Sequence, residues 1–154
     1  MSASASRQAE RTILFVCTGN TCRSPMAERI ALAELGSIGR EARVISAGLS
    51  AMPGGPATPE GVRALEQIGI DPGRHVSRAL TRELIEQADV IYAMTDAHAR
   101  AIIQGVPDAR AKVHLLDPDG RDVPDPIGGP QDLYIKTAER IRELIRTRIE
   151  EFEL

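Results

Sequence analysis

The stretch from Ile13 to Pro25, ILFVCTGNTCRSP, most constrains how this chain can fold. Its first four residues are apolar, which is typical of a parallel strand buried on both faces. It ends in Ser24-Pro25, a hydroxyl suited to an N-cap followed by a proline suited to the first helical position. A strand that enters a helix through a tight loop directs backbone N–H groups and the positive helix end at one point. The stretch therefore predicts an anion-binding loop between the first strand and a helix.

Two side chains in this loop suggest chemistry. Arg23 can hold two oxygens of a phosphate in a bidentate fork. Cys17, at the strand tip, faces the same centre, where the positive field favours the nucleophilic thiolate over the thiol. The alternative is a structural loop with Cys17 as a small buried residue. The neighbours argue against it, because Gly19 permits a tight turn, Asn20 can tie the loop together and Ser24 can hydrogen-bond the thiolate. The loop lacks the lysine of a Walker motif, so neither nucleotide nor Mg²⁺ is implied.

Composition bounds the class of protein. With 42% hydrophobic and 27% charged residues, a chain of 154 residues fits one soluble globular domain. The net charge of −3 argues against general binding to nucleic acid or to membranes, and no apolar run approaches a membrane span. Residues 1–11 are interpreted as a flexible tail without the apolar segment of a secretory signal, and residues 12–154 as a single domain. Two cysteines in one loop form no disulfide framework, so a cytoplasmic protein is expected.

Short apolar runs alternate with amphipathic stretches along the chain. Strands are expected at residues 13–16, 43–46, 89–94 and 112–115. Helices are expected at residues 26–35, 58–68, 81–87, 96–104 and 131–151. Residues 116–130 have no period and many Asp, Gly and Pro residues, which indicates a long functional loop. The alternation favours an α/β fold with helices on both faces of a parallel sheet and a ligand site beyond the carboxyl ends of the strands, where Cys17 falls.

Asp125 is a candidate proton donor in the long loop. Pro124 and Pro126 stiffen the backbone on either side of it. A carboxyl group held rigidly near the mouth of the Cys17 loop could protonate a leaving group. Taken alone, an aspartate beside proline is usually a turn residue, but the Cys17 loop in the same chain favours the proton donor instead.

Together these residues resemble the low-molecular-weight protein tyrosine phosphatase family. The motifs are VCTGNTCRSPMAE, SAG after the second strand and a distal Asp-Pro. The resemblance implies a three-layer, phosphotyrosine protein phosphatase I-like fold with a four-stranded parallel sheet in the order 2-1-3-4. It also implies a mechanism without metal or other cofactor. In that mechanism Cys17 attacks phosphorus in line, Arg23 and the loop amides stabilise the transition state, and Asp125 protonates the departing atom before activating water.

The resemblance also assigns the remaining site residues. Ser46 and His75 stand at positions of the family's supporting network, although a surface-loop histidine is the alternative for His75. Many members use a cysteine placed like Cys22 to trap the oxidised nucleophile as a disulfide, and a passive packed thiol is the alternative. His98 and His114 have no ligand partners at useful spacing, so no zinc site is predicted. The phosphate-binding loop comprises Thr18, Gly19, Asn20, Thr21, Cys22 and Ser24.

The chain departs from the tyrosine-specific pattern where the substrate would bind. Members that act on phosphotyrosine tend to carry aromatic residues after the distal Asp-Pro and in the loop after the second strand. Here Ile127 and residues 50–53 occupy those places, and Thr21 stands where such members commonly carry isoleucine. CTGNTCRSP with Asp-Pro-x-Gly-Gly resembles the bacterial protein-arginine phosphatase branch, whose substrate has a P–N bond on a guanidinium. We therefore predict a phosphatase acting on phosphoarginine in a phosphorylated protein.

Three alternatives stay open on the sequence alone. One is a tyrosine phosphatase of the same fold. Another is an arsenate reductase, which is disfavoured because thioredoxin-linked versions need a further cysteine and none follows Cys22. The third is a non-catalytic anion-binding module, disfavoured by the intact Cys17, Arg23 and Asp125. No nucleic acid or membrane partner is expected, and the protein is expected to be a monomer.

Overall fold

The computed structural model describes residues 10–152, with the side chains of residues 10–150. The sheet is parallel with strand order β2-β1-β3-β4, as predicted. Its strands are β1 (Thr12–Cys17), β2 (Arg43–Gly48), β3 (Val90–Ala93) and β4 (Val113–Leu115). The helices are α2 (Arg23–Ser37), α3 (Pro59–Gln67), α4 (Arg82–Gln87), α5 (Asp96–Gly105), the 3-10 helix η1 (Pro107–Lys112) and α6 (Gln131–Phe152). Most of the predicted tail, residues 1–9, lies outside the described residues.

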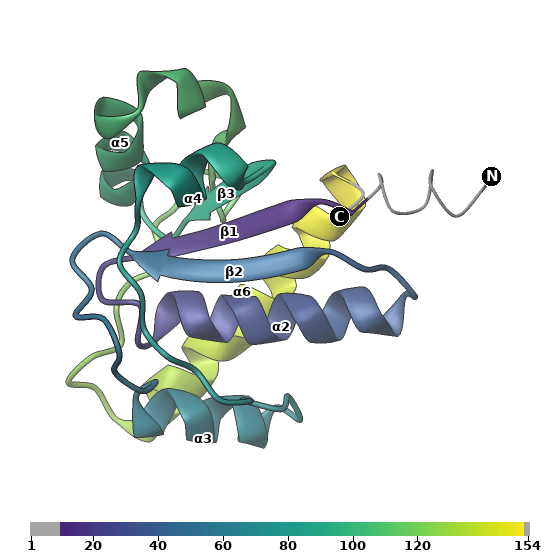
Figure 1. The fold of residues 1–154 in the computed structure, drawn as a ribbon. Coiled ribbons are helices and arrows are strands. Elements are labelled where there is room, and N and C mark those ends of the chain that lie inside the picture. Colours follow the sequence, from purple (N-terminus) through teal and green to yellow (C-terminus); the bar gives the residue numbers. More distant parts are fainter. Residues whose placement is uncertain (1–9, 153–154) are drawn as a thin grey trace.

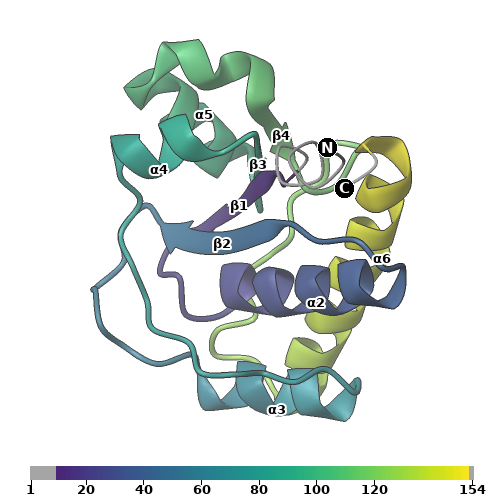
Figure 2. The same ribbon diagram turned by 45° about the vertical axis from the view of Figure 1, so that its right-hand side comes forward.

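Helices cover both faces of the sheet, so the predicted three-layer α/β architecture is confirmed. Figure 1 shows α2, α3 and α6 on one side and α4 and α5 on the other, and the turned view in Figure 2 shows the same layers. Side chains of β1 alternate between them. Ile13 and Phe15 pack in the core with α2 and α6, whereas Leu14 and Val16 pack in the core with α4 and α5. Burial on both faces explains why β1 is an uninterrupted apolar run.

Two local predictions differ from the structure. Ser24 is not the N-cap of α2, because the helix begins at Arg23 with Cys22 in the cap position, and Pro25 lies in the third helical position. The Ser24 hydroxyl is bonded inside the loop instead, as described below. The 3-10 helix η1 was not predicted, because a short 3-10 turn has no apolar periodicity to mark it.

The carboxyl ends of the strands meet at one edge of the sheet. At the left of Figure 1, β1 and β2 both end there, and the loop after β1 turns back into α2. The predicted long loop is attached at the same edge, because the N–H of Leu116, its first residue, donates to the carbonyl of Ala93 and the N–H of Val123, in its middle, donates to the carbonyl of Met94. Within residues 10–152, no helix is long and apolar enough to cross a bilayer.

Candidate active site

Cys17 ends β1 with its sulfur inside the protein. Its Sγ lies 2.9 Å from the hydroxyl of Ser24, and the residue is only 2% exposed. No side chain caps the first turn of α2, which starts six residues later. The N–H groups of that turn therefore remain available to a ligand, and the helix dipole adds positive potential. This arrangement suits an anion bound directly beside the sulfur.

Asn20 fixes the loop from within. It is fully buried and has a φ of 55°, in the left-handed region that is uncommon for residues other than glycine. Its Nδ2 donates to the hydroxyls of Ser24 and Ser46, each at 2.9 Å, and its Oδ1 accepts from the Arg78 N–H at 2.8 Å. Its carbonyl accepts a hydrogen bond from His75 Nε2 at 2.6 Å. These bonds satisfy the buried amide and offset the backbone strain.

The Asn20 amide also sets the direction of the two hydroxyl protons. Both serine oxygens accept from Nδ2, so each serine proton must point to another partner. Ser46 donates to the Glu28 carboxylate at 2.7 Å. The proton of Ser24 is left for the sulfur of Cys17, where a donor stabilises negative charge. The structure thus brings the predicted loop and support residues together and adds Glu28, which the sequence did not indicate.

Gly48, the last residue of the SAG motif, explains how the loop can lie against β2. A Cβ at Gly48 would fall 2.5 Å from the Thr18 carbonyl oxygen and 2.9 Å from the Asn20 nitrogen, so no side chain fits there. The predicted role of Gly19 is wrong. A Cβ at Gly19 would make only an ordinary 3.6 Å contact with the Thr21 hydroxyl oxygen, and the left-handed residue of the turn is Asn20.

Arg23 connects the loop to the segment that carries Asp125. The Arg23 side chain is buried, and its Nη1 donates to the carbonyl of Val123 at 2.9 Å. Its Nη2 lies 3.5 Å from the Asp125 carboxylate, which is 39% exposed. Asp125 also accepts from the N–H of Ile127 at 3.0 Å, which holds its carboxylate in a turn. The two predicted residues therefore meet although they lie on distant parts of the chain.

Cys22 is a second buried thiol of the same loop. Burial raises its pKa to about 12, and the negative charges of Asp125 and Cys17 act in the same direction. A hydrogen bond with the Thr58 side chain acts in the opposite direction but does not outweigh them. Cys22 is therefore a protonated thiol at neutral pH, close enough to Cys17 and Asp125 to respond to their charges.

His98 is a site residue that the sequence did not indicate. Its Nε2 lies 2.8 Å from the hydroxyl oxygen of Thr18, and its Nδ1 is buried without a hydrogen-bond partner among the described residues. Burial lowers the pKa of His98, and the positive charge of Arg23 lowers it further. The only sequence signal was position, because His98 follows β3 at the carboxyl edge of the sheet.

The lowered pKa of His98 predicts that acid destabilises the fold. The unfolded chain takes up a proton at His98 near its ordinary pKa of 6.5, whereas the folded protein takes it up only at lower pH. The free energy of unfolding therefore falls as the pH drops below that value. We expect His98→Gln, which cannot titrate, to lose less stability than wild type between about pH 7.5 and 5.5 in urea unfolding. Equal losses in both proteins would contradict this assignment.

The fold and the site together define a class of protein. A cysteine at the end of the central parallel strand, a buried arginine six residues later and a carboxylate on a distant loop are the parts of a cysteine-dependent phosphatase. Residues 12–153 match the low molecular weight phosphotyrosine protein phosphatase family, and the chain belongs to it.

Similar proteins include members with two substrate specificities. A protein-arginine-phosphatase of Bacillus subtilis is 44% identical over 138 residues, which is 87% of this chain and 91% of the relative. A low molecular weight protein-tyrosine-phosphatase of Acinetobacter johnsonii is 36% identical over 129 residues, which is 83% of this chain and 88% of the relative. The crystal structure of a YwlE mutant from Bacillus subtilis superposes with a TM-score of 0.89 at 40% identity, covering 94% of this chain and all of the other.

Proposed function

We propose that this phosphatase removes phosphate from arginine side chains of proteins. The observation that carries the proposal is the absence of an aromatic wall at a site otherwise equipped for phosphate. Phe15, Tyr92 and Tyr134 are each 4% exposed or less, so no aromatic ring is exposed among the side chains that the structure describes. Ile127 and Met52 are exposed instead, at 62% and 83%, on the two loops where tyrosine-specific members carry aromatic residues. The 44% identity to a protein-arginine-phosphatase supports the same substrate.

In the proposed first step, the Cys17 thiolate attacks phosphorus while Arg23 and the loop N–H groups hold the phosphoryl oxygens. An S–P bond forms as the P–N bond to the substrate breaks. Asp125 gives its proton to the departing nitrogen, which leaves a guanidinium beside a carboxylate. In the second step Asp125 takes a proton from water, the water oxygen attacks phosphorus, and the Cys17 thiolate leaves with inorganic phosphate as the product.

The contact between Asp125 and Arg23 supports a second use of Asp125, which is to bind the guanidinium that forms when the proton has been transferred and the P–N bond is broken. The Asp125 carboxylate already lies 3.5 Å from one guanidinium nitrogen, and 39% of its side chain is open to solvent. Carboxylates and guanidinium groups form complementary hydrogen bonds. A second guanidinium, that of the substrate, can therefore reach the open side of Asp125 and be recognised by it.

The decisive experiment compares kcat/KM for a protein carrying phosphoarginine with kcat/KM for a phosphotyrosine peptide. We expect the larger value for phosphoarginine. A larger value for phosphotyrosine would replace the proposal with the alternative that the Acinetobacter relative supports, a tyrosine phosphatase. Turnover of either substrate would exclude a non-catalytic anion-binding module. The cytoplasmic location and the monomeric state stay predictions from the sequence.

Cys22 provides a redox prediction for the same site. We expect mild peroxide to inactivate the enzyme reversibly, because the Cys22 sulfur can attack a sulfenic acid formed at Cys17, which gives a disulfide and releases water. Oxidation of Cys17 also removes its negative charge, a charge that raises the pKa of Cys22, although less than burial and Asp125 do. A thiol reductant should restore activity in wild type but not in Cys22→Ser, whose Cys17 oxidises further. Mass spectrometry of the oxidised protein identifies the bridge. If none is found while activity still recovers, Cys22 is a packing residue.

A further inference from the structure

The segment that carries Asp125 has no regular secondary structure to fix its position. Residues 116–130 contain no helix or strand. On the C-terminal side of Asp125 the segment is held by the buried Pro126 and by a hydrogen bond between the Gly128 backbone and Tyr134. On the N-terminal side the buried anchor is Val123, which donates its N–H to the Met94 carbonyl at 2.8 Å and accepts from Arg23 at 2.9 Å. Pro124 has no N–H to add a further backbone bond. On this N-terminal side, the position of Asp125 therefore depends on how residues 117–123 are held.

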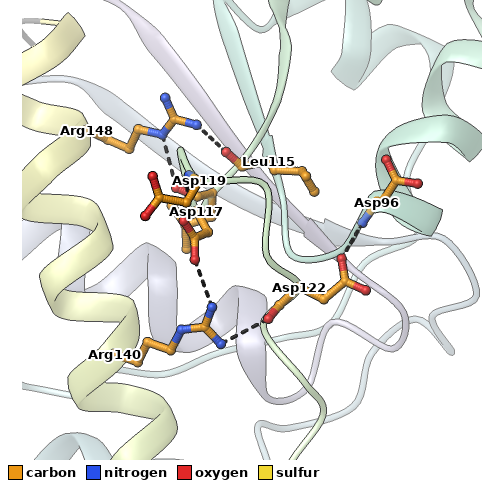
Figure 3. Close-up of polar contacts among 8 residues, drawn as sticks. Asp96, Leu115, Asp117, Asp119, Asp122, Arg140 and Arg148 are labelled. Atoms are coloured by element: carbon orange, nitrogen blue, oxygen red, sulfur yellow. Dashed lines mark hydrogen bonds and ion pairs between the residues drawn. The ribbon is translucent and has the colours of Figure 1, made fainter.

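Arg140 of α6 bridges two points of this segment, as Figure 3 shows. Its Nη2 donates to the Asp117 carboxylate at 2.9 Å, and its Nη1 donates to the carbonyl of Asp122 at 2.9 Å. Asp122 is also held from the other side, because its carboxylate accepts from the Asp96 N–H at the start of α5. Arg140 thus completes a connection from α6 through Asp122 to α5, one residue before Val123.

The surroundings of Arg140 show why this polar contact matters. A surface hollow lies on each side of Arg140, one lined by residues 123–126 with Lys136 and Thr137, the other lined by residues 117–119 with Glu143 and Thr147. At its two ends this part of the segment is buried, because Leu116 and Val123 pack in the core with residues of α6. Residues 118–122 between them are exposed and depend more on polar contacts, and exposed segments of this kind open easily. Asp117 is 5% exposed. Burial alone would raise its pKa, but hydrogen bonds from the Asp119 N–H and Arg140 lower it overall, so Arg140 faces a charged partner.

We propose that Arg140 is a positioning residue for the proton donor. It holds Asp122, and through Asp122 and Val123 it keeps Asp125 within reach of the leaving group. The inference rests on the proposed role of Asp125 in the reaction. It assigns a function in catalysis to a side chain that has no contact with Cys17 or Arg23 among its described bonds.

The test uses two aryl phosphates that differ in their need for a proton. Phenolate is a poor leaving group and needs the acid, whereas dinitrophenolate leaves without one. We expect Arg140→Ala to lower kcat/KM for phenyl phosphate by about 10-fold, since small misplacements of a catalytic group are costly. The value for dinitrophenyl phosphate and the inhibition constant of inorganic phosphate should stay within about twofold of wild type. Arg140→Lys keeps the positive charge but not the two-pronged guanidinium, so its kcat/KM for phenyl phosphate should lie between those of wild type and Arg140→Ala.

Two further variants make the outcome decisive. Arg142→Ala removes a neighbouring arginine of α6 that donates to the Ile68 carbonyl, away from the Asp125 segment, and should leave both substrates unchanged. Asp125→Asn should show the same dependence on leaving group as Arg140→Ala, but more strongly. If Asp125→Asn shows it and both Arg140 variants do not, the inference about Arg140 is wrong. If Asp125→Asn itself lowers kcat/KM equally for both substrates, Asp125 is not the proton donor, and the inference about Arg140 is then wrong as well.

Discussion

Replacing Cys17 with serine will reduce kcat/KM by more than about 10³-fold, because a serine hydroxyl stays protonated at the pH where a thiolate forms. The Ser24 hydroxyl, 2.9 Å from the sulfur, stabilises negative charge on sulfur but cannot ionise a serine. Loss of a nucleophile is among the largest effects that a single substitution can have on an enzyme. The measurement is kcat/KM for phosphoarginine protein and for a generic aryl phosphate, so that the result does not depend on the substrate assignment.

Binding of inorganic phosphate should survive the same substitution. Arg23, the free N–H groups of α2 and the bonds of Asn20 do not involve the sulfur. A Kd for phosphate within about tenfold of wild type, together with an unchanged melting temperature, would show that the loss is chemical and not structural. Residual activity within about tenfold of wild type would instead show that Cys17 is not the nucleophile.

The parts of the fold and site that could be predicted from the sequence are those specified locally. The apolar run of β1 is buried on both faces, and the loop and helix after it follow directly in the chain. Cys17, Asn20, Arg23 and Ser24 therefore share one turn of backbone, and their proximity needs no knowledge of the tertiary structure. Asp125 was more difficult to predict, because its meeting with Arg23 depends on the path of a segment without periodic structure.

The parts that could not be predicted depend on contacts between distant elements. His98 reaches Thr18 only because β3 lies beside β1 and ends at the same edge of the sheet. For Ser24 the sequence predicts the hydrogen bond to Cys17, which the structure contains, but the N-cap role is wrong because α2 begins at Arg23. The sequence places the tight turn at Gly19, because glycine is the default residue for such a conformation, whereas the left-handed residue is Asn20, and three of its four bonds reach distant parts of the chain.

Thr21 is the loop residue on which substrate preference is expected to depend. Its backbone is held, because its carbonyl accepts from the Thr58 N–H at 2.8 Å at the start of α3. Its side chain is half-buried, with the hydroxyl on the side of Gly19. Cys17, Arg23 and Asp125 provide chemistry that phosphatases of either specificity can use. Selectivity must therefore come from the side chains that line the path to them, and we propose that Thr21 is a polar one.

Thr21→Ile is expected to shift preference from phosphoarginine toward phosphotyrosine. Both residues are β-branched, so the loop backbone should keep its conformation, while a hydroxyl is exchanged for a longer apolar arm. A flat ring tolerates that wall, whereas a hydrated guanidinium loses a polar neighbour and some room. Such a contrast is worth roughly 10- to 200-fold in the ratio of the two kcat/KM values.

A second variant at position 21 separates the loss of the hydroxyl from the loss of room in the pocket. Thr21→Val removes the hydroxyl without adding length, so it measures the polar contribution alone. A ratio that moves halfway in Thr21→Val and fully in Thr21→Ile would show that polarity and room both contribute. A ratio unmoved in both variants would exclude Thr21 as a specificity residue, and a wild type that already prefers phosphotyrosine would exclude the arginine assignment itself. Because Cys17, Arg23 and Asp125 are unchanged in every one of these proteins, a shifted ratio with turnover retained could come only from the wall of the pocket.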